Sequence, residues 1–68
     1  MMLSALEIQT LFNLGFKSKG ENKYAKDATL IEITPDNVIL EYVANGIKIR
    51  EKMLNSQELF KRLRKQLG

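Results

Sequence analysis

The chain has 68 residues, with no cysteine and no histidine, and eleven Lys and Arg against eight Asp and Glu give it a net charge of +3. This composition excludes disulfides, thiolate and imidazole metal ligands, and the nucleophile–imidazole pairs that many hydrolases use. A chain this short forms one domain, which we place at residues 1–68. We therefore expect a small domain that is not an enzyme and that holds no metal or cofactor.

The first predicted element is a helix over residues 5–14. Ser4 and Glu7 have the spacing of a capping box, in which each side chain satisfies a backbone N–H of the other residue. Apolar residues follow at helical spacing: Ala5, Ile8, Leu11 and Phe12. Gly15 can adopt the left-handed conformation that ends many helices.

The segment 17–27 is polar, weakly periodic and rich in lysine. We expect a basic loop here, with room for a short irregular edge strand near Tyr24. The sequence leaves open whether this loop is ordered, because long connections in compact domains are often mobile or functional.

Three strands are predicted next, over residues 28–34, 38–44 and 47–52. Asn45-Gly46 is the strongest short signal for a type I′ hairpin turn, and it sets Glu41 opposite Arg50 as an exposed cross-strand pair. The same register predicts a core face at alternate positions: Val38, Leu40, Tyr42, Ile47 and Ile49.

The first hairpin admits two registers. A two-residue turn at Pro35-Asp36 places Ile31 and Ile33 on the core face, whereas a bulged three-residue turn places Leu30 and Glu32 there. Burying Glu32 without a partner is costly, so we favour the two-residue turn.

A second amphipathic helix closes the chain. Asn55 or Ser56 caps it, Glu58 lies in its first turn, and Leu59 and Leu63 lie on its apolar stripe. Two flanking helices on one face of the strands predict a two-layer α+β fold: a three-stranded antiparallel meander in the order α-β-β-β-α.

The other face of this sheet is the predicted binding surface. It carries aliphatic side chains among charged ones, which is typical of contact sites in proteins. We expect a non-enzymatic interaction module that binds a protein partner, or a second copy of itself, through this face and an edge strand. The residues predicted to contact the partner are Leu30, Ile39, Val43, Lys48 and Arg50.

Nucleic-acid binding is the alternative, because Lys and Arg at alternate positions of one strand project from the same face. The candidate cations come from this strand and from the basic loop: Lys17, Lys19, Lys23, Lys26, Lys48, Arg50 and Lys52. Only electrostatics favours this hypothesis.

The sequence contains no apolar run of the roughly 20 residues that a membrane-spanning helix needs. We expect that the N-terminal residues are not a secretory signal, because they lack a basic region and include Glu7. We therefore expect a soluble cytoplasmic protein without a membrane partner, and no substrate is evident.

Overall fold

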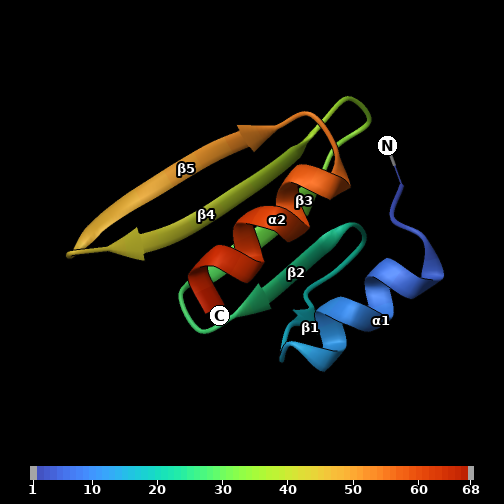
Figure 1. The fold of residues 1–68 in the computed structure, drawn as a ribbon, viewed down its shortest axis with the longest axis horizontal. Coiled ribbons are helices and arrows are strands. Elements are labelled where there is room, and N and C mark those ends of the chain that lie inside the picture. Colours follow the sequence, from blue (N-terminus) through green and yellow to red (C-terminus); the bar gives the residue numbers. More distant parts are fainter. Residues whose placement is uncertain (1, 68) are drawn as a thin grey trace.

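The computed structural model describes residues 2–67, which form two helices and a five-stranded antiparallel sheet (Figure 1). The elements in chain order are α1 (Ala5–Asn13), β1 (Lys17–Ser18), β2 (Lys23–Lys26), β3 (Thr29–Ile33), β4 (Val38–Ala44), β5 (Ile47–Met53) and α2 (Ser56–Leu67). Each strand pairs with its neighbour in sequence, so the sheet is a simple meander.

The ends of α1 follow the sequence prediction. The Glu7 backbone N–H donates to the Ser4 hydroxyl at 3.2 Å, and the Ser4 N–H donates to the Glu7 carboxylate at 2.9 Å. At the other end Gly15 has a φ of +102°, and the Phe16 N–H donates back to the Leu11 carbonyl at 3.0 Å. This Schellman arrangement satisfies carbonyls of the last turn and brings Phe16 into the core.

The prediction of a three-stranded sheet is wrong, because residues 17–27 add two more strands, β1 and β2. The core side of these strands carries only one large apolar residue, Tyr24, and the other core-side position of β2 is Lys26, so hydrophobic alternation is almost absent from the sequence. Asn22 and Asp27 have positive φ values of 60° and 52° and help the chain to reverse on either side of β2. The fold remains two-layer α+β at the coarse level, in the order α-β-β-β-β-β-α.

The remaining strands confirm both predicted hairpins. Glu41 lies opposite Arg50 across β4 and β5, and Asn45 and Gly46 have the positive φ values, 55° and 77°, of a type I′ turn. Between β3 and β4 Ile33 pairs with Val38, which leaves Pro35 and Asp36 as the two turn residues.

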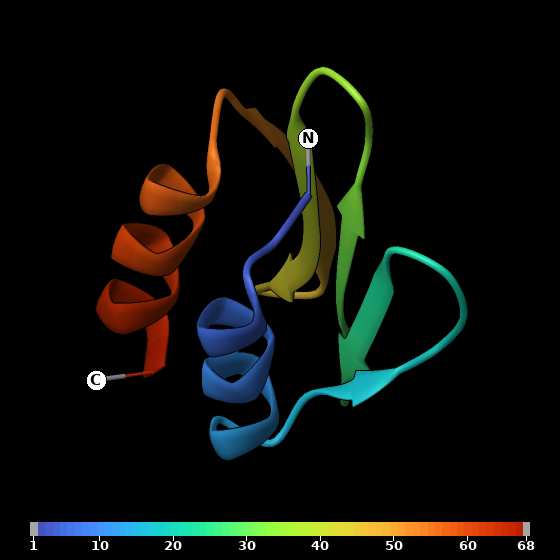
Figure 2. The same ribbon diagram turned by 90° about the vertical axis from the view of Figure 1, so that its right-hand side faces the viewer.

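Both helices cover the same face of the sheet (Figure 2). Asn55 caps α2 by accepting the Glu58 N–H at 3.0 Å, which confirms the predicted helix start. The fully buried side chains come from both layers: Leu11, Ile31, Val38, Leu40, Leu59 and Leu63. The opposite face of the sheet is left uncovered by any described element.

One predicted core residue does not reach the core. Ile47 is on the helix side of β5, yet 65% of its surface is exposed. The β4–β5 hairpin extends beyond the end of α2, so no helix lies over its tip (Figure 1). Tyr42 and Ile49, nearer the helix, are half-buried.

Candidate partner-binding surface

The strand register decides which residues share the uncovered face. Residues directly opposite each other on paired strands point to the same side of a sheet. One such row crosses all five strands, and its members are Lys17, Ala25, Leu30, Glu41 and Arg50. The next row crosses four strands, and its members are Lys23, Glu32, Ile39 and Lys52. We call the face formed by these rows, together with Lys19, Val43 and Lys48, the outer face.

Its apolar centre is smaller than the sequence implies. Leu30 and Ile39 lie on the outer face as predicted, but both are half-buried by neighbouring side chains. Val43 is 50% exposed and lies toward the projecting end of β4. The outer face therefore offers a narrow apolar strip rather than a broad hydrophobic patch.

The charges on the outer face are sorted by strand. Six exposed cations lie on the bordering strands and the β1–β2 turn: Lys17, Lys19 and Lys23 on one side, and Lys48, Arg50 and Lys52 on the other. The Lys19 N–H donates to the Lys23 carbonyl at 2.9 Å and continues the pairing of β1 with β2. The two carboxylates, Glu32 and Glu41, lie on the central strands β3 and β4. The face thus has two cationic borders around an acidic and apolar centre.

Glu41 forms a cross-strand ion pair, but its partner is Lys48 and not the predicted Arg50. Glu41 lies opposite Arg50, but its carboxylate contacts the Lys48 Nζ at 3.2 Å. Lys48 is the diagonal neighbour of Glu41, and long side chains reach across that diagonal. Within residues 2–67 the Arg50 side chain has no ion pair, so its charge is available to a ligand.

Lys26 is the one predicted cation that lies on the wrong side. It pairs with Thr29 on the helix side of β2, and its Nζ donates to the Leu14 carbonyl at 2.6 Å. A cation there complements the negative end of the α1 dipole and satisfies a carbonyl of the last turn. Lys26 is therefore a structural residue of the α1 end.

A hollow of about 340 Å³ adjoins the border formed by β1 and β2. It is lined by Gly15, Lys17, Lys19, Ala25, Lys26 and Asp27. Three lysines against one carboxylate give this hollow a positive potential. A phosphate-sized anion would therefore be attracted to it.

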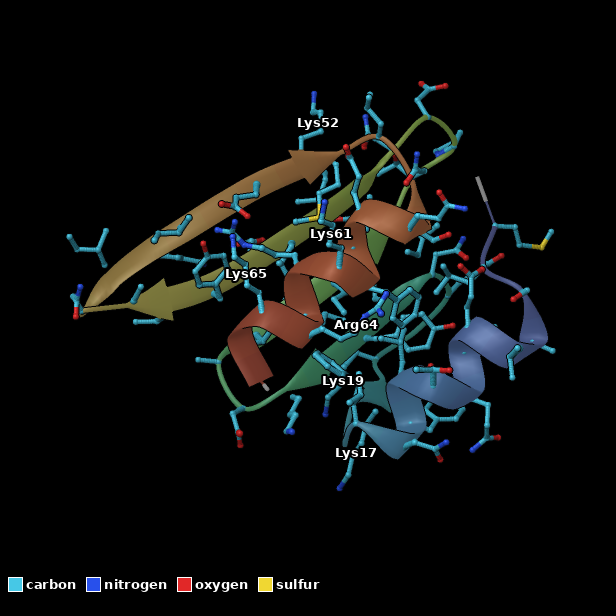
Figure 3. All side chains as sticks on the ribbon, in the orientation of Figure 1. Lys17, Lys19, Lys52, Lys61, Arg64 and Lys65 are labelled. Atoms are coloured by element: carbon cyan, nitrogen blue, oxygen red, sulfur yellow. The ribbon has the colours of Figure 1, made fainter. Side chains whose placement is uncertain are left out.

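The helix layer carries further cations, of which Lys61, Arg64 and Lys65 are exposed on α2 (Figure 3). Figure 3 also shows Lys17 and Lys19 beside β1 and Lys52 at the opposite edge of the sheet, on β5. The α2 cations therefore do not belong to the outer face. They provide matched positions for control substitutions.

Arg62 differs from the other α2 cations because its guanidinium is hydrogen-bonded to side chains of the sheet. It donates to the Glu51 carboxylate at 2.7 Å and to the Tyr42 hydroxyl at 2.8 Å, and Tyr42 in turn donates to Glu51 at 3.2 Å. The hydrogen bond with Tyr42 raises the pKa of Arg62, and its attraction to Glu51 acts in the same direction. These hydrogen bonds connect α2 to β4 and β5. No pattern in the sequence predicted them.

Strand β5 forms one border of the sheet and pairs only with β4 among the described strands. Its outer-face residues are all cationic, and lysines on an edge strand hinder uncontrolled pairing with other chains. An added strand would need carboxylates opposite Lys48, Arg50 and Lys52 to pair favourably.

Searches of protein-family models, of curated proteins and of solved structures returned no match to this chain. Among residues 2–67 no group of three or more Asp or Glu side chains is placed to hold a metal ion. No helix of the described chain is long and apolar enough to cross a membrane.

Proposed function

We propose that this protein is a non-enzymatic interaction module that binds nucleic acid through the outer face of its sheet. The observation that carries this proposal is the meeting of two basic segments, residues 17–23 and 48–52, on one uncovered face. Six exposed cations lie on this face beside the carboxylates of Glu32 and Glu41, so the face is positively charged.

The physical basis is electrostatic. A nucleic acid carries a dense row of phosphates with condensed counterions, and a surface that replaces those ions gains free energy as they are released. All five aromatic residues lie elsewhere, since Tyr24 and Tyr42 point to the helix side and the three phenylalanines belong to α1, α2 and the segment between α1 and β1. The contacts would therefore be made to the backbone and would carry little sequence preference.

The test is a binding titration by fluorescence anisotropy with random-sequence DNA and RNA across a range of salt concentrations. The wild-type affinity should fall steeply as salt rises. Arg50→Gln/Lys52→Gln should weaken binding about tenfold or more at low salt and should flatten the salt dependence. The matched control, Lys61→Gln/Lys65→Gln, removes the same charge from α2 and should bind almost as the wild type does.

Two results would overturn the proposal. One is the absence of binding to either nucleic acid at low salt. The other is an equal loss in the outer-face variant and the α2 control, since that would mean that net charge alone drives the interaction.

A protein partner, or a second copy of the chain, is the second candidate. It is favoured by the exposed aliphatic residues Val43 and Ile47 near the hairpin tip and by the unpaired edge of β5. Antiparallel pairing of β5 with itself about Arg50 would set Lys48 opposite Lys52, which is destabilising. An acidic partner strand therefore fits this edge better than a second copy does.

Molar mass by light scattering, with wild type and Val43→Asp, tests this second candidate. Self-association that Val43→Asp abolishes would support an interface at the hairpin. A monomer at all concentrations, together with unchanged capture of partners by Val43→Asp, would remove it.

A further inference from the structure

Building on the proposed function, we infer that the ligand is a duplex whose two phosphate backbones lie on the two cationic borders of the outer face. The inference deepens the proposal, because it specifies the form of nucleic acid and the way in which it lies on the sheet. It rests on how the charges are distributed across the strands, not on their total.

The positions of the charged residues on the strands favour two phosphate backbones over one. A single phosphate backbone would favour one continuous cationic path. The outer face instead has cations on β1, β2 and β5, separated by Glu32 on β3 and Glu41 on β4. Glu32 repels a phosphate placed over the centre of the sheet, and the Glu41 carboxylate already holds the Lys48 ammonium at 3.2 Å, so the charge pattern favours two separate tracks with a groove between them.

The separation of the two cationic borders is close to the width of a DNA groove. Neighbouring strands lie about 4.8 Å apart, so the backbones of β2 and β5 are separated by about 14 Å and those of β1 and β5 by about 19 Å. The major groove of B-DNA is about 12 Å wide, and its two backbones lie just outside that width. The spacing of the two borders is therefore of the size needed to reach both backbones across one groove.

The outer face lacks aromatic rings on which the bases of a single strand could stack. Proteins that bind single strands combine a basic path with exposed aromatic rings on which the bases stack. No aromatic side chain lies on the outer face, and the most exposed ring, Phe12, is on α1 and packs against Tyr24 with their centroids 6.2 Å apart. A single strand would gain charge contacts from this face but no stacking.

The hollow beside β1 adds a discrete contact to one track. Lys17 and Lys19 belong to the cationic border and also line this hollow. A backbone that follows this border can therefore place one phosphate near Lys17 and Lys19. The β5 border has three cations at alternate positions, spaced about 7 Å apart along the strand.

The experiment compares a DNA duplex, an RNA duplex and the corresponding single strands, using the full chain. Two double variants neutralise one border each: Lys17→Gln/Lys19→Gln and Arg50→Gln/Lys52→Gln. We expect the wild type to bind a duplex at least tenfold more tightly than a single strand. Each border variant should weaken duplex binding by a similar factor, about tenfold or more at low salt, while Lys61→Gln/Lys65→Gln leaves it nearly unchanged.

A third variant, Glu32→Gln, tests the role of the acidic centre. Removing this charge lets a phosphate pass over the middle of the sheet, so single-strand affinity should rise by a larger factor than duplex affinity. Circular dichroism and thermal unfolding establish that each variant retains the fold. An equal rise for both ligands would contradict the two-track arrangement.

The outcomes separate this inference from the proposed function. Equal or tighter binding of single strands, or loss of duplex binding from one border variant but not the other, overturns the two-track duplex and leaves nucleic-acid binding intact. Absence of binding to every nucleic acid overturns both. Capture of an acidic protein under the same conditions would then point to the second candidate.

Discussion

Alternate residues of the same strands point to the two faces of the sheet. Many of those on the covered face are buried and apolar, whereas many of those on the outer face are charged and exposed. On β4 Val38 and Leu40 are completely buried beneath the helices, whereas Ile39 and Glu41 face outward and are only half-buried. On β5 all three outward positions are cationic, while Met53 on the other side is buried. The covered face supplies the apolar burial that stabilises the domain, whereas the outer face carries six exposed cations, of which Lys48 is ion-paired with Glu41.

Because the two faces differ in this way, a substitution on one face should change the free energy of unfolding, and a substitution on the other should change the ligand affinity. Changes on the covered face remove packed apolar surface and should lower the free energy of unfolding. Changes on the outer face should leave that free energy nearly constant and alter ligand affinity.

Leu40→Ala should cause the largest loss, because it removes a completely buried side chain from the centre of the sheet. The expected cost is about 2–5 kcal/mol in the free energy of unfolding, measured by urea denaturation. Ile39→Ala changes the neighbouring outward residue and should cost less than half as much. Equal costs for the two variants would mean that the faces do not differ in packing.

Tyr42→Phe should cost about 1 kcal/mol, because it removes a hydroxyl that bonds both Glu51 and Arg62. The ring and its contact with the Arg62 guanidinium, 5.9 Å from the ring centroid, are retained. The measurement is again urea denaturation. A change within experimental error would show that the network does not help to hold α2 on the sheet.

Glu7→Gln should lower stability by about 0.5 kcal/mol at neutral pH, since Glu7 is only half-buried and solvent screens its interactions. The Ser4 N–H holds the pKa of Glu7 below its ordinary value of 4.5, with a smaller contribution from Ser56. The folded state therefore binds this proton less readily than the unfolded state. The advantage of wild type is complete above pH 4.5 and is lost as pH falls through the lowered pKa.

The pH dependence distinguishes this capping interaction from a simple change in helix propensity. The difference in free energy of unfolding between wild type and Glu7→Gln should shrink from pH 7 to pH 3. A difference that stays constant over this range would contradict the assigned role of the carboxylate.

Lys48→Gln should have the smallest effect on stability, a few tenths of a kcal/mol at most, although it breaks the ion pair with Glu41. The pair lies on the outer face and Lys48 is largely exposed. Its removal should nevertheless weaken duplex binding, measured by anisotropy. A loss of stability greater than about 1 kcal/mol would mean that the outer face has a structural role too.

Local signals in the sequence determined much of this fold. The capping box at Ser4 and Glu7, the glycine stop at Gly15 and the Asn45-Gly46 turn all depend on residues a few positions apart. Their geometry is set by short-range hydrogen bonds and permitted φ values, which a sequence displays directly. The register that follows from Asn45-Gly46 also assigned Leu40 and Glu41 to their correct faces.

Only the tertiary structure revealed β1 and β2 and the complete outer face. These strands have too little hydrophobic alternation to be recognised. Strand β3 offers β2 an edge with backbone groups to pair, and β2 in turn offers such an edge to β1. That pairing sets Lys17 and Lys23 on the same face as Arg50, and it places Lys26 on the other side, at the end of α1. Local sequence determined the turns and caps because they are short-range interactions, whereas the site required four successive strand pairings that together bring Lys17 and Lys23 to the same face as Arg50.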